Sequence, residues 1–331
     1  MKIRKPDYYD RFQCIAGACS DSCCIGWEID VDEERIAAYR EVDGELGERL
    51  KTCMDWEEGH FILQGKEERC PFLNQENLCD LIIGLGEESL CEICREHPRF
   101  YEWYDDLTEV GVGLCCEAAA RLVLEGDRPA QFVVHEDYDA EDSEELEDAE
   151  DADTLQVLFQ ARETAFAILQ NRTRSIWERL SRFITYIEEL QEGLDFGNLD
   201  EIEESAEYYR SDEWTEEEPE FEYEQSAASI YAGLIGLCRE LEAIDESWPA
   251  TLDSLEELLS DAGKFCKLAQ EMLEANHARE YEYEHLAVYF VYRYFMKCRS
   301  DGDLFSKGML AIFCILLIGC WMWRNSLKAG H

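Results

Sequence analysis

Positive charge is scarce in this chain of 331 residues. It has 30 Lys and Arg residues against 76 Asp and Glu residues, which gives a formal net charge of −46 at pH 7. Such a surface repels a phosphate backbone at long range, so the composition argues against nucleic acid as the main partner. The same charge favours a cationic partner such as lysine-rich protein, and it suits a general adaptation to salt or solubility equally well.

Long apolar runs are also scarce. The N-terminus, MKIRKPD, lacks the apolar stretch that follows the charges of a signal peptide, so we expect a protein of the reducing cytoplasm. Residues 308–323 are uncharged but number only 16, whereas a membrane span needs about 20. We interpret them as a buried helix, with a short or tilted membrane anchor as the alternative.

Nucleotide-binding signatures are missing as well. No GxGxxG follows a strand-like run, no P-loop occurs, and no repeat of fixed period is evident. Composition instead divides the chain into a cysteine-rich region at 1–135, an acidic linker or loop at 136–153 and a helical domain at 154–331. In the last region apolar residues recur every three or four positions, as in amphipathic helices. Residues 200–224 are acidic again, and we expect a loop or a poorly packed helix there.

Cysteine, in contrast, is abundant. Of the 16 cysteines, 11 lie within the first 116 residues. Two of the pairs, Cys23–Cys24 and Cys115–Cys116, are vicinal, and adjacent cysteines bridge each other only with strain. Thiolates on short spacings and separate loops can instead converge on one metal. There are more of them than one tetrahedral zinc needs, which favours an iron–sulfur cluster. Zinc remains the alternative, and a purely structural role for the metal stays open.

Three segments carry a family resemblance. They read YYDRFQCIAGACSDSCCIGWEIDVDEE from residue 8, CPFLNQENLCDLIIGLGEESLCEICREHPRFYEW from residue 70 and LCCEAAARL from residue 114. They resemble the flagellin lysine-N-methylase family, and the cysteine region is similar to small proteins with a CxxCxxCC motif thought to chelate zinc or iron. The helical half agrees in LQNRTRSIWERL, from residue 169, and HLAVYFVYRYFMK, from residue 285.

The resemblance implies a protein-lysine N-methyltransferase that uses S-adenosylmethionine, acts on flagellin and binds a 4Fe-4S cluster. It implies metal ligands at the positions shared with the chelating motif, namely Cys14, Cys19, Cys23, Cys24, Cys70, Cys79 and Cys94. A reserve group consists of Cys91, Cys115 and Cys116. Cations after Cys94 could hold the carboxylate of the methyl donor or neutralise a cluster, and the candidates are Arg95, His97 and Arg99. The alternative is a charged loop in which they pair with Glu96 and Glu102.

The reaction itself sets a further expectation. Lysine begins with a pKa near 10.4 and attacks a methyl group only when deprotonated, which desolvation by aromatic walls promotes. Aromatic candidates near the cysteines, each of which could equally be core, are Tyr8, Tyr9, Phe12, Trp27, Phe100, Tyr101, Trp103 and Tyr104. We therefore expect a mainly α fold, with an irregular cysteine-ligated N-terminal module followed by a bundle-like helical domain. A non-catalytic chelator and a redox or electron-transfer protein are the alternative functions.

Overall fold

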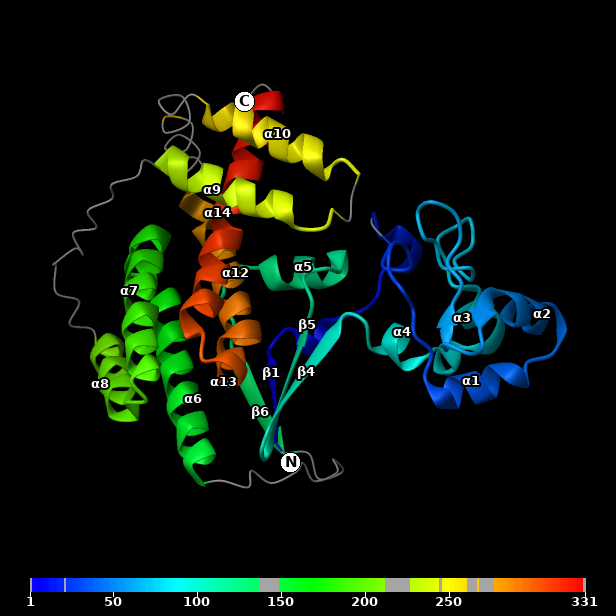
Figure 1. The fold of residues 1–331 in the computed structure, drawn as a ribbon, viewed down its shortest axis with the longest axis horizontal. Coiled ribbons are helices and arrows are strands. Elements are labelled where there is room, and N and C mark those ends of the chain that lie inside the picture. The colour runs from blue at the N-terminus through cyan, green and yellow to red at the C-terminus, as the bar shows by residue number, and fades with distance from the viewer. Residues whose placement is uncertain are drawn as a thin grey trace. The chain divides into compact units, whose positions relative to one another are not determined.

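The chain forms two compact units in a computed structural model (Figure 1). The structure describes residues 2–20, 22–136, 149–211, 227–243, 246–260, 267 and 277–329. Within them, one unit comprises residues 2–125 and 131–136, and the other comprises residues 126–130 and everything from 149 onward. The fold is mainly α, as the sequence predicts. Most of the predicted acidic linker lies outside the described residues, and its last residues, 149–153, already belong to a helix.

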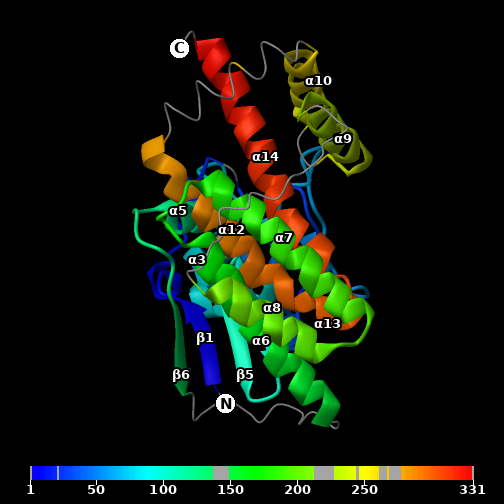
Figure 2. The ribbon, with the colours of Figure 1, turned by 90° about the vertical axis from the view of Figure 1, so that its left-hand side faces the viewer.

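The helical unit is built around long amphipathic helices that pack on one another (Figure 2). Its central helices are α6 (Ala149–Leu169), α7 (Ile176–Asp195), α8 (Leu199–Arg210), α12 (Glu280–Tyr294) and α14 (Leu304–Ala329). The three- and four-residue spacing of the sequence becomes their buried stripe, in which Phe183, Ile187 and Leu190 of α7 have no exposed surface. A capping box fixes where α7 begins, because the Ser175 hydroxyl accepts from the Glu178 N–H while the Glu178 carboxylate accepts from the Ser175 N–H.

Smaller elements complete this unit. They are α9 (Ala227–Glu240), α10 (Trp248–Leu259), α13 (Cys298–Asp301) and the 3-10 turns η4 (His277–Arg279) and η5 (Phe295–Lys297). Helices α9 and α10 share a second apolar cluster with the C-terminal half of α14. These elements are helical, as the three- and four-residue spacing within residues 154–331 predicts, while residues 261–266 and 268–276 lie outside the described chain.

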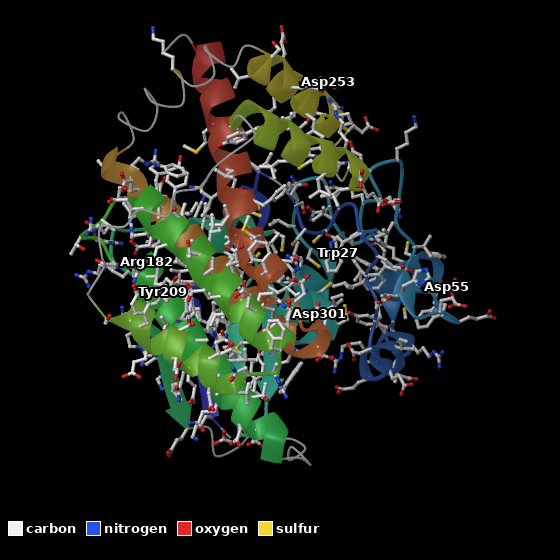
Figure 3. All side chains as sticks on the ribbon, turned by 60° about the vertical axis from the view of Figure 1, so that its left-hand side comes forward. Trp27, Asp55, Arg182, Tyr209, Asp253 and Asp301 are labelled. Carbon is white, nitrogen blue, oxygen red and sulfur yellow. The ribbon has the colours of Figure 1, made fainter. Side chains whose placement is uncertain are left out.

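Helix α8 corrects the expectation for the acidic stretch. Its residues Ile202, Ala206 and Tyr209 are buried, so residues 199–210 form a well-packed helix. The Tyr209 hydroxyl donates to the Glu189 carboxylate at 2.6 Å, and the Arg182 guanidinium lies 4.5 Å from the centre of the Tyr209 ring (Figure 3). The acidic residues occupy the opposite face, which is why composition alone suggests a loop. Residues 212–224 lie outside the described chain.

Helix α14 contains the uncharged run of the sequence. Its first half is core, since Leu304, Ala311 and Ile315 have no exposed surface. Gly308 permits this approach, because a Cβ there would lie 2.6 Å from Cδ1 of Ile187. Residues 304–322 are also long and apolar enough to cross a membrane by length and composition, with 39% of that window buried in the protein.

The first unit contains a sheet that the sequence does not predict. Its strands β1 (Lys2–Pro6), β4 (Arg99–Tyr104), β5 (Leu107–Val112) and β6 (Phe132–Glu136) lie in the order β4-β5-β1-β6 (Figure 1). Strand β1 is parallel to β5, with Ile3 opposite Thr108, and antiparallel to β6. The polar sequence KIRKP becomes a strand only because partners more than a hundred residues away flank it.

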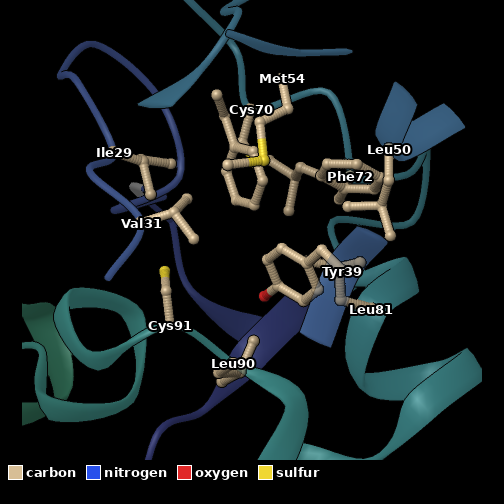
Figure 4. Close-up of a cluster of buried hydrophobic side chains, with 12 residues drawn as sticks. Ile29, Val31, Tyr39, Leu50, Met54, Cys70, Phe72, Leu81, Leu90 and Cys91 are labelled. Carbon is tan, nitrogen blue, oxygen red and sulfur yellow. The ribbon is translucent and has the colours of Figure 1, made fainter. Parts of the chain in front are cut away.

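Short elements make up the rest of this unit. They are α1 (Glu33–Arg40), α2 (Gly44–Cys53), α3 (Asp80–Leu85), α4 (Glu92–Glu96), α5 (Glu117–Leu124), the hairpin β2 (Met54–Asp55) and β3 (His60–Phe61), and the 3-10 turns η1 (Tyr9–Arg11), η2 (Ala16–Ala18) and η3 (Glu87–Ser89). Loops and helices from residue 29 to residue 91 share one buried cluster (Figure 4). Within it, the ring centres of Phe61 and Phe72 are 5.0 Å apart. Cys70 and Cys91 are buried members of that cluster.

Candidate metal centre

Backbone pairing between two loops brings the first predicted cysteines together. The Cys70 N–H donates to the Cys24 carbonyl at 2.8 Å, and Ile25 bridges Arg69 beside them. The chain then turns so that Leu73 bridges Cys79. Three cysteines from distant points of the sequence therefore border the same buried cluster.

A second pair enters that cluster from α4. Cys91 is the N-cap of the helix, and the neighbouring Cys94 thiol lowers the pKa of Cys91. The Asp32 carboxylate accepts from the Glu92 N–H at 2.8 Å, which anchors this turn to the start of α1. Cys91 is buried and Cys94 is half-buried. The reserve position Cys91 is thus as deeply placed as the main candidates.

The thiols of these loops influence one another electrostatically. The hydrogen bond from Cys23 lowers the pKa of the Cys24 thiol to about 7, against the opposing effect of burial. Burial raises the pKa of Cys70 to about 12 and also raises that of Cys79. For Cys94, the bond to Cys91 and burial both raise the pKa. Each of these groups would lose its proton more readily if a cation lay among them.

The remaining predicted ligands form a more exposed group. The Cys14 sulfur accepts from the Ala16 N–H at 3.4 Å. The bond to Cys24 and burial raise the pKa of Cys23, and Cys14 and Cys116 add smaller effects in the same direction. The Cys19 thiol lies 3.6 Å from a Glu117 carboxylate oxygen. Cys115 is exposed. Every predicted cysteine therefore lies in the first unit, some in the buried cluster and some on the loops beside it.

The donor chemistry fits a thiophilic metal or an iron–sulfur cluster. Within the described part of the chain all the cysteines are free thiols, and soft thiolates select zinc and iron–sulfur clusters over hard cations. The same described residues contain no group of three or more His, Cys, Asp or Glu side chains that is already arranged to hold a metal ion. The loops thus gather the donors, and ligation would require their side chains to turn toward a common point.

The three predicted cofactor-binding residues take different positions. Arg95 pairs with Glu96 at 3.1 Å, in keeping with the charged-loop alternative. Arg99 instead lies over aromatic rings, with its guanidinium carbon 5.3 Å from the centre of Phe12. The His97 ring is 5.5 Å from that of Trp27, and burial lowers the pKa of His97.

Glu117 is a residue that the sequence analysis missed. Its carboxylate accepts from the N–H and the hydroxyl of Ser20, both at 2.7 Å, and pairs with Arg121 at 2.6 Å. These bonds hold the pKa of Glu117 at about 2, the bond from the Ser20 hydroxyl contributing most. The glutamate directly after Cys116, at the start of a helix, was the available signal.

The helical unit has a buried ion-pair group of its own. Glu284 has no exposed surface, and its carboxylate accepts from Arg172 at 2.8 Å and from Arg179 at 2.6 Å. Arg179 is itself buried on α7. This group joins α12 to α7 and to the turn before it, which makes it a structural link within the unit.

Comparison with known proteins identifies the helical unit. A family model described as the FliB lysine N-methylase C-terminal domain matches residues 162–325. The chain is 27% identical over 144 residues to a Lysine-N-methylase of Salmonella typhimurium, covering 39% of this chain and 34% of that protein. It is 26% identical over 144 residues to the Flagellar biosynthetic protein FliU of Salmonella muenchen, covering 39% of this chain and 82% of that protein.

The match thus spans about a third of the length of the Salmonella typhimurium relative. No solved structure matches the chain at a significant level. The matched residues, from 162 on α6 to 325 on α14, include the central helices of the second unit. Over these residues the chain is similar to the FliB lysine N-methylase C-terminal domain, in line with the resemblance in its sequence.

Proposed function

We propose that this protein transfers methyl groups from S-adenosylmethionine to lysine side chains of flagellin in the cytoplasm. The observation that carries the proposal is the family match over residues 162–325. The names of the relatives, Lysine-N-methylase and Flagellar biosynthetic protein FliU, support the reaction and the flagellar setting. The net charge of −46 supports a lysine-rich partner.

The cysteines of the first unit would hold an iron–sulfur cluster in this proposal. The candidates are those predicted or reserve cysteines that lie in or beside the buried cluster, namely Cys24, Cys70, Cys79, Cys91 and Cys94. When bound, such a cluster supplies one-electron chemistry and fixes the loops that ligate it. Zinc, held by the same thiols, is the alternative occupant.

The methyl transfer places a clear demand on the protein. The lysine nitrogen uses its lone pair to bond the methyl carbon, the carbon–sulfur bond of the donor breaks, and S-adenosylhomocysteine leaves. The nitrogen must have lost its proton first, and a carboxylate close to it would hold that proton in place. The acidic residues therefore serve better as a steering surface than as lining of the reaction site.

The decisive experiment incubates anaerobically purified protein with S-adenosylmethionine and unmodified flagellin. We expect mass increments of one or more methyl groups on surface lysines, and we expect iron and sulfide in the protein, with visible absorption. A chelator would bind metal without consuming the donor, and an electron carrier would change its redox state without modifying lysine. Absence of donor-dependent methylation by cluster-loaded protein would therefore refute the proposed function.

Single cysteine substitutions test which thiols bind the metal. Cys94→Ser should lower the iron content, whereas Cys53→Ser should not, because Cys53 lies outside the predicted ligand set although it borders the same apolar cluster. Unchanged metal content in Cys94→Ser and in the matching variants of Cys24, Cys70 and Cys79 would refute the ligand assignment. Full methylation activity in metal-free protein would support the methyltransferase and would show that the metal has only a structural role.

A further inference from the structure

Strand β4 is one edge of the four-stranded sheet. At alternate residues of such a strand, the backbone N–H and C=O groups point away from the sheet. The two-residue turn after Tyr104 makes Tyr104 and Leu107 a hydrogen-bonded pair, so Phe100 and Glu102 also bond to β5. Tyr101 and Trp103 consequently direct their N–H and C=O groups away from β5. Among the described residues, no backbone hydrogen bond engages them on that side.

The same two residues present an aromatic surface. Their side chains lie on one face of the strand, with ring centres 6.2 Å apart and ring planes inclined by 20°. Trp103 is 65% exposed, although an exposed indole forgoes the burial that most tryptophans obtain. Tyr101 is half-buried and fixed in place, because its hydroxyl donates to Glu96 at 2.6 Å.

A carboxylate lies directly beside this surface. Glu96 accepts the hydrogen bond from the Tyr101 hydroxyl at 2.6 Å and pairs with Arg95 at 3.1 Å. An aromatic face next to a carboxylate attracts a cation that approaches with an apolar stem. A lysine side chain has both parts.

The opposite edge of the sheet provides a contrast. Strand β6 exposes Val133 and Val134, at 40% and 52%. The aromatic ring on that strand, Phe132, already lies under a cation, because the Arg4 guanidinium carbon is 5.3 Å from its centre. An incoming lysine would therefore find an aromatic pair available only at the β4 edge, among the two edges of the described sheet.

We propose that β4 is a docking edge for an extended, lysine-bearing segment of a partner protein. The segment adds a strand beside β4 and lays the stem and ammonium of one lysine over the Tyr101–Trp103 pair. The choice of lysine rests on the proposed function, whereas the open edge and the aromatic pair do not. Main-chain hydrogen bonds would bind an extended segment of any sequence. The aromatic pair would add a preference for a segment that carries a cation.

The test measures binding of defined peptides by fluorescence anisotropy. The probe is a fluorescein-labelled decapeptide of alternating Thr and Val with one central lysine. The reference peptides carry norleucine in place of the lysine, or N-methylated backbone amides beside it. Wild-type protein should bind the lysine peptide more tightly than either reference, by roughly three- to tenfold over norleucine. Equal binding of all three peptides would overturn the proposal.

Variants locate the binding at the aromatic pair. Trp103→Leu keeps an apolar side chain and should abolish the preference for lysine over norleucine, whereas Trp103→Phe should retain it. Val134→Ala, on the opposite edge, should bind as the wild type does. A lysine preference that survives in Trp103→Leu would refute the assignment of the site.

The same proteins in the methylation assay distinguish this inference from the proposed function. Lysine-selective binding that depends on Trp103 in a protein that methylates nothing would support the docking edge and refute the methyltransferase. Methylation with an unchanged KM for flagellin in Trp103→Leu would refute the docking edge and leave the methyltransferase in place.

Discussion

The two units of this protein use sulfur and hydrocarbon in different ways. The first unit has no described helix longer than the 10 residues of α2, and its buried cluster includes Cys70 and Cys91 with further thiols at its border. The helical unit has helices of 20 and 21 residues whose buried faces are mostly aliphatic and aromatic, with Arg162 and Arg179 as buried exceptions. The helical unit therefore contains what it needs to fold, whereas the first unit places titratable thiols where a core would normally have hydrocarbon.

Removal of the proposed metal should have the largest effect on this difference between the units. A structural metal in a small domain contributes on the order of 10 kcal/mol or more of folding free energy. We expect chelation to make residues 2–125 sensitive to protease and to remove one thermal transition, while the helical unit keeps its own. Limited proteolysis with mass spectrometry and calorimetry measure both, and two unchanged transitions would contradict the prediction.

Loss of Glu284 should produce the converse effect on the helical unit. Its carboxylate is fully buried between Arg172 and Arg179, so Glu284→Ala leaves buried charge without a partner. We expect a loss of about 3–5 kcal/mol from the unfolding free energy of that unit. Urea denaturation followed by circular dichroism measures the change.

A matched control lies two residues earlier on the same helix. The Glu282 side chain is 17% exposed, but its partner Arg279 is 58% exposed and can turn to water when the glutamate is removed. Its substitution by alanine should cost about 1 kcal/mol or less. Similar losses in the two variants would show that the buried pair has no special part in holding α12 to α7.

The smallest expected effect is a titration in the first unit. Because hydrogen bonds hold the pKa of Glu117 at about 2, against an ordinary value of 4.5, ionised Glu117 stabilises the folded state at neutral pH. That contribution is complete above about pH 4.5 and is lost as the pH falls toward 2. Carbon-13 NMR of the carboxyl group measures the pKa directly. A Ser20→Ala variant should raise it, and a wild-type value near 4.5 would mean that the carboxylate does not join the loop at Ser20 to α5.

The sequence predicts best those elements whose signal is local. The helices α6 and α7 repeat apolar residues at three and four positions, and the capping box at Ser175 is readable directly. The sheet could not be predicted in this way, because β1 has the polar sequence KIRKP and acquires its form from β5 and β6. For α8 the acidic composition obscured a spacing, from Ile202 through Ala206 to Tyr209, that was present in the sequence.

In the candidate site, too, the local features could be predicted from the sequence and the long-range pairing could not. Cysteine spacing identified the thiols and predicted that separate loops would meet. Which thiols enter the buried cluster depends on the pairing of residues 24–26 with 68–70, which only the tertiary structure specifies. Metal binding by these thiols remains a prediction.

The place of β1 within the sheet has a consequence during translation. Strand β1 begins at the second residue, but the strands that pair with it lie at 107–112 and 132–136. It can therefore pair only after most of the first unit has been synthesised. Pairing over such a sequence distance is slow because the intervening loop must close first. The cysteines between these strands are synthesised before the sheet can form. Closure of the sheet is therefore a late step in the folding of the first unit, and the thiols stay accessible until it occurs.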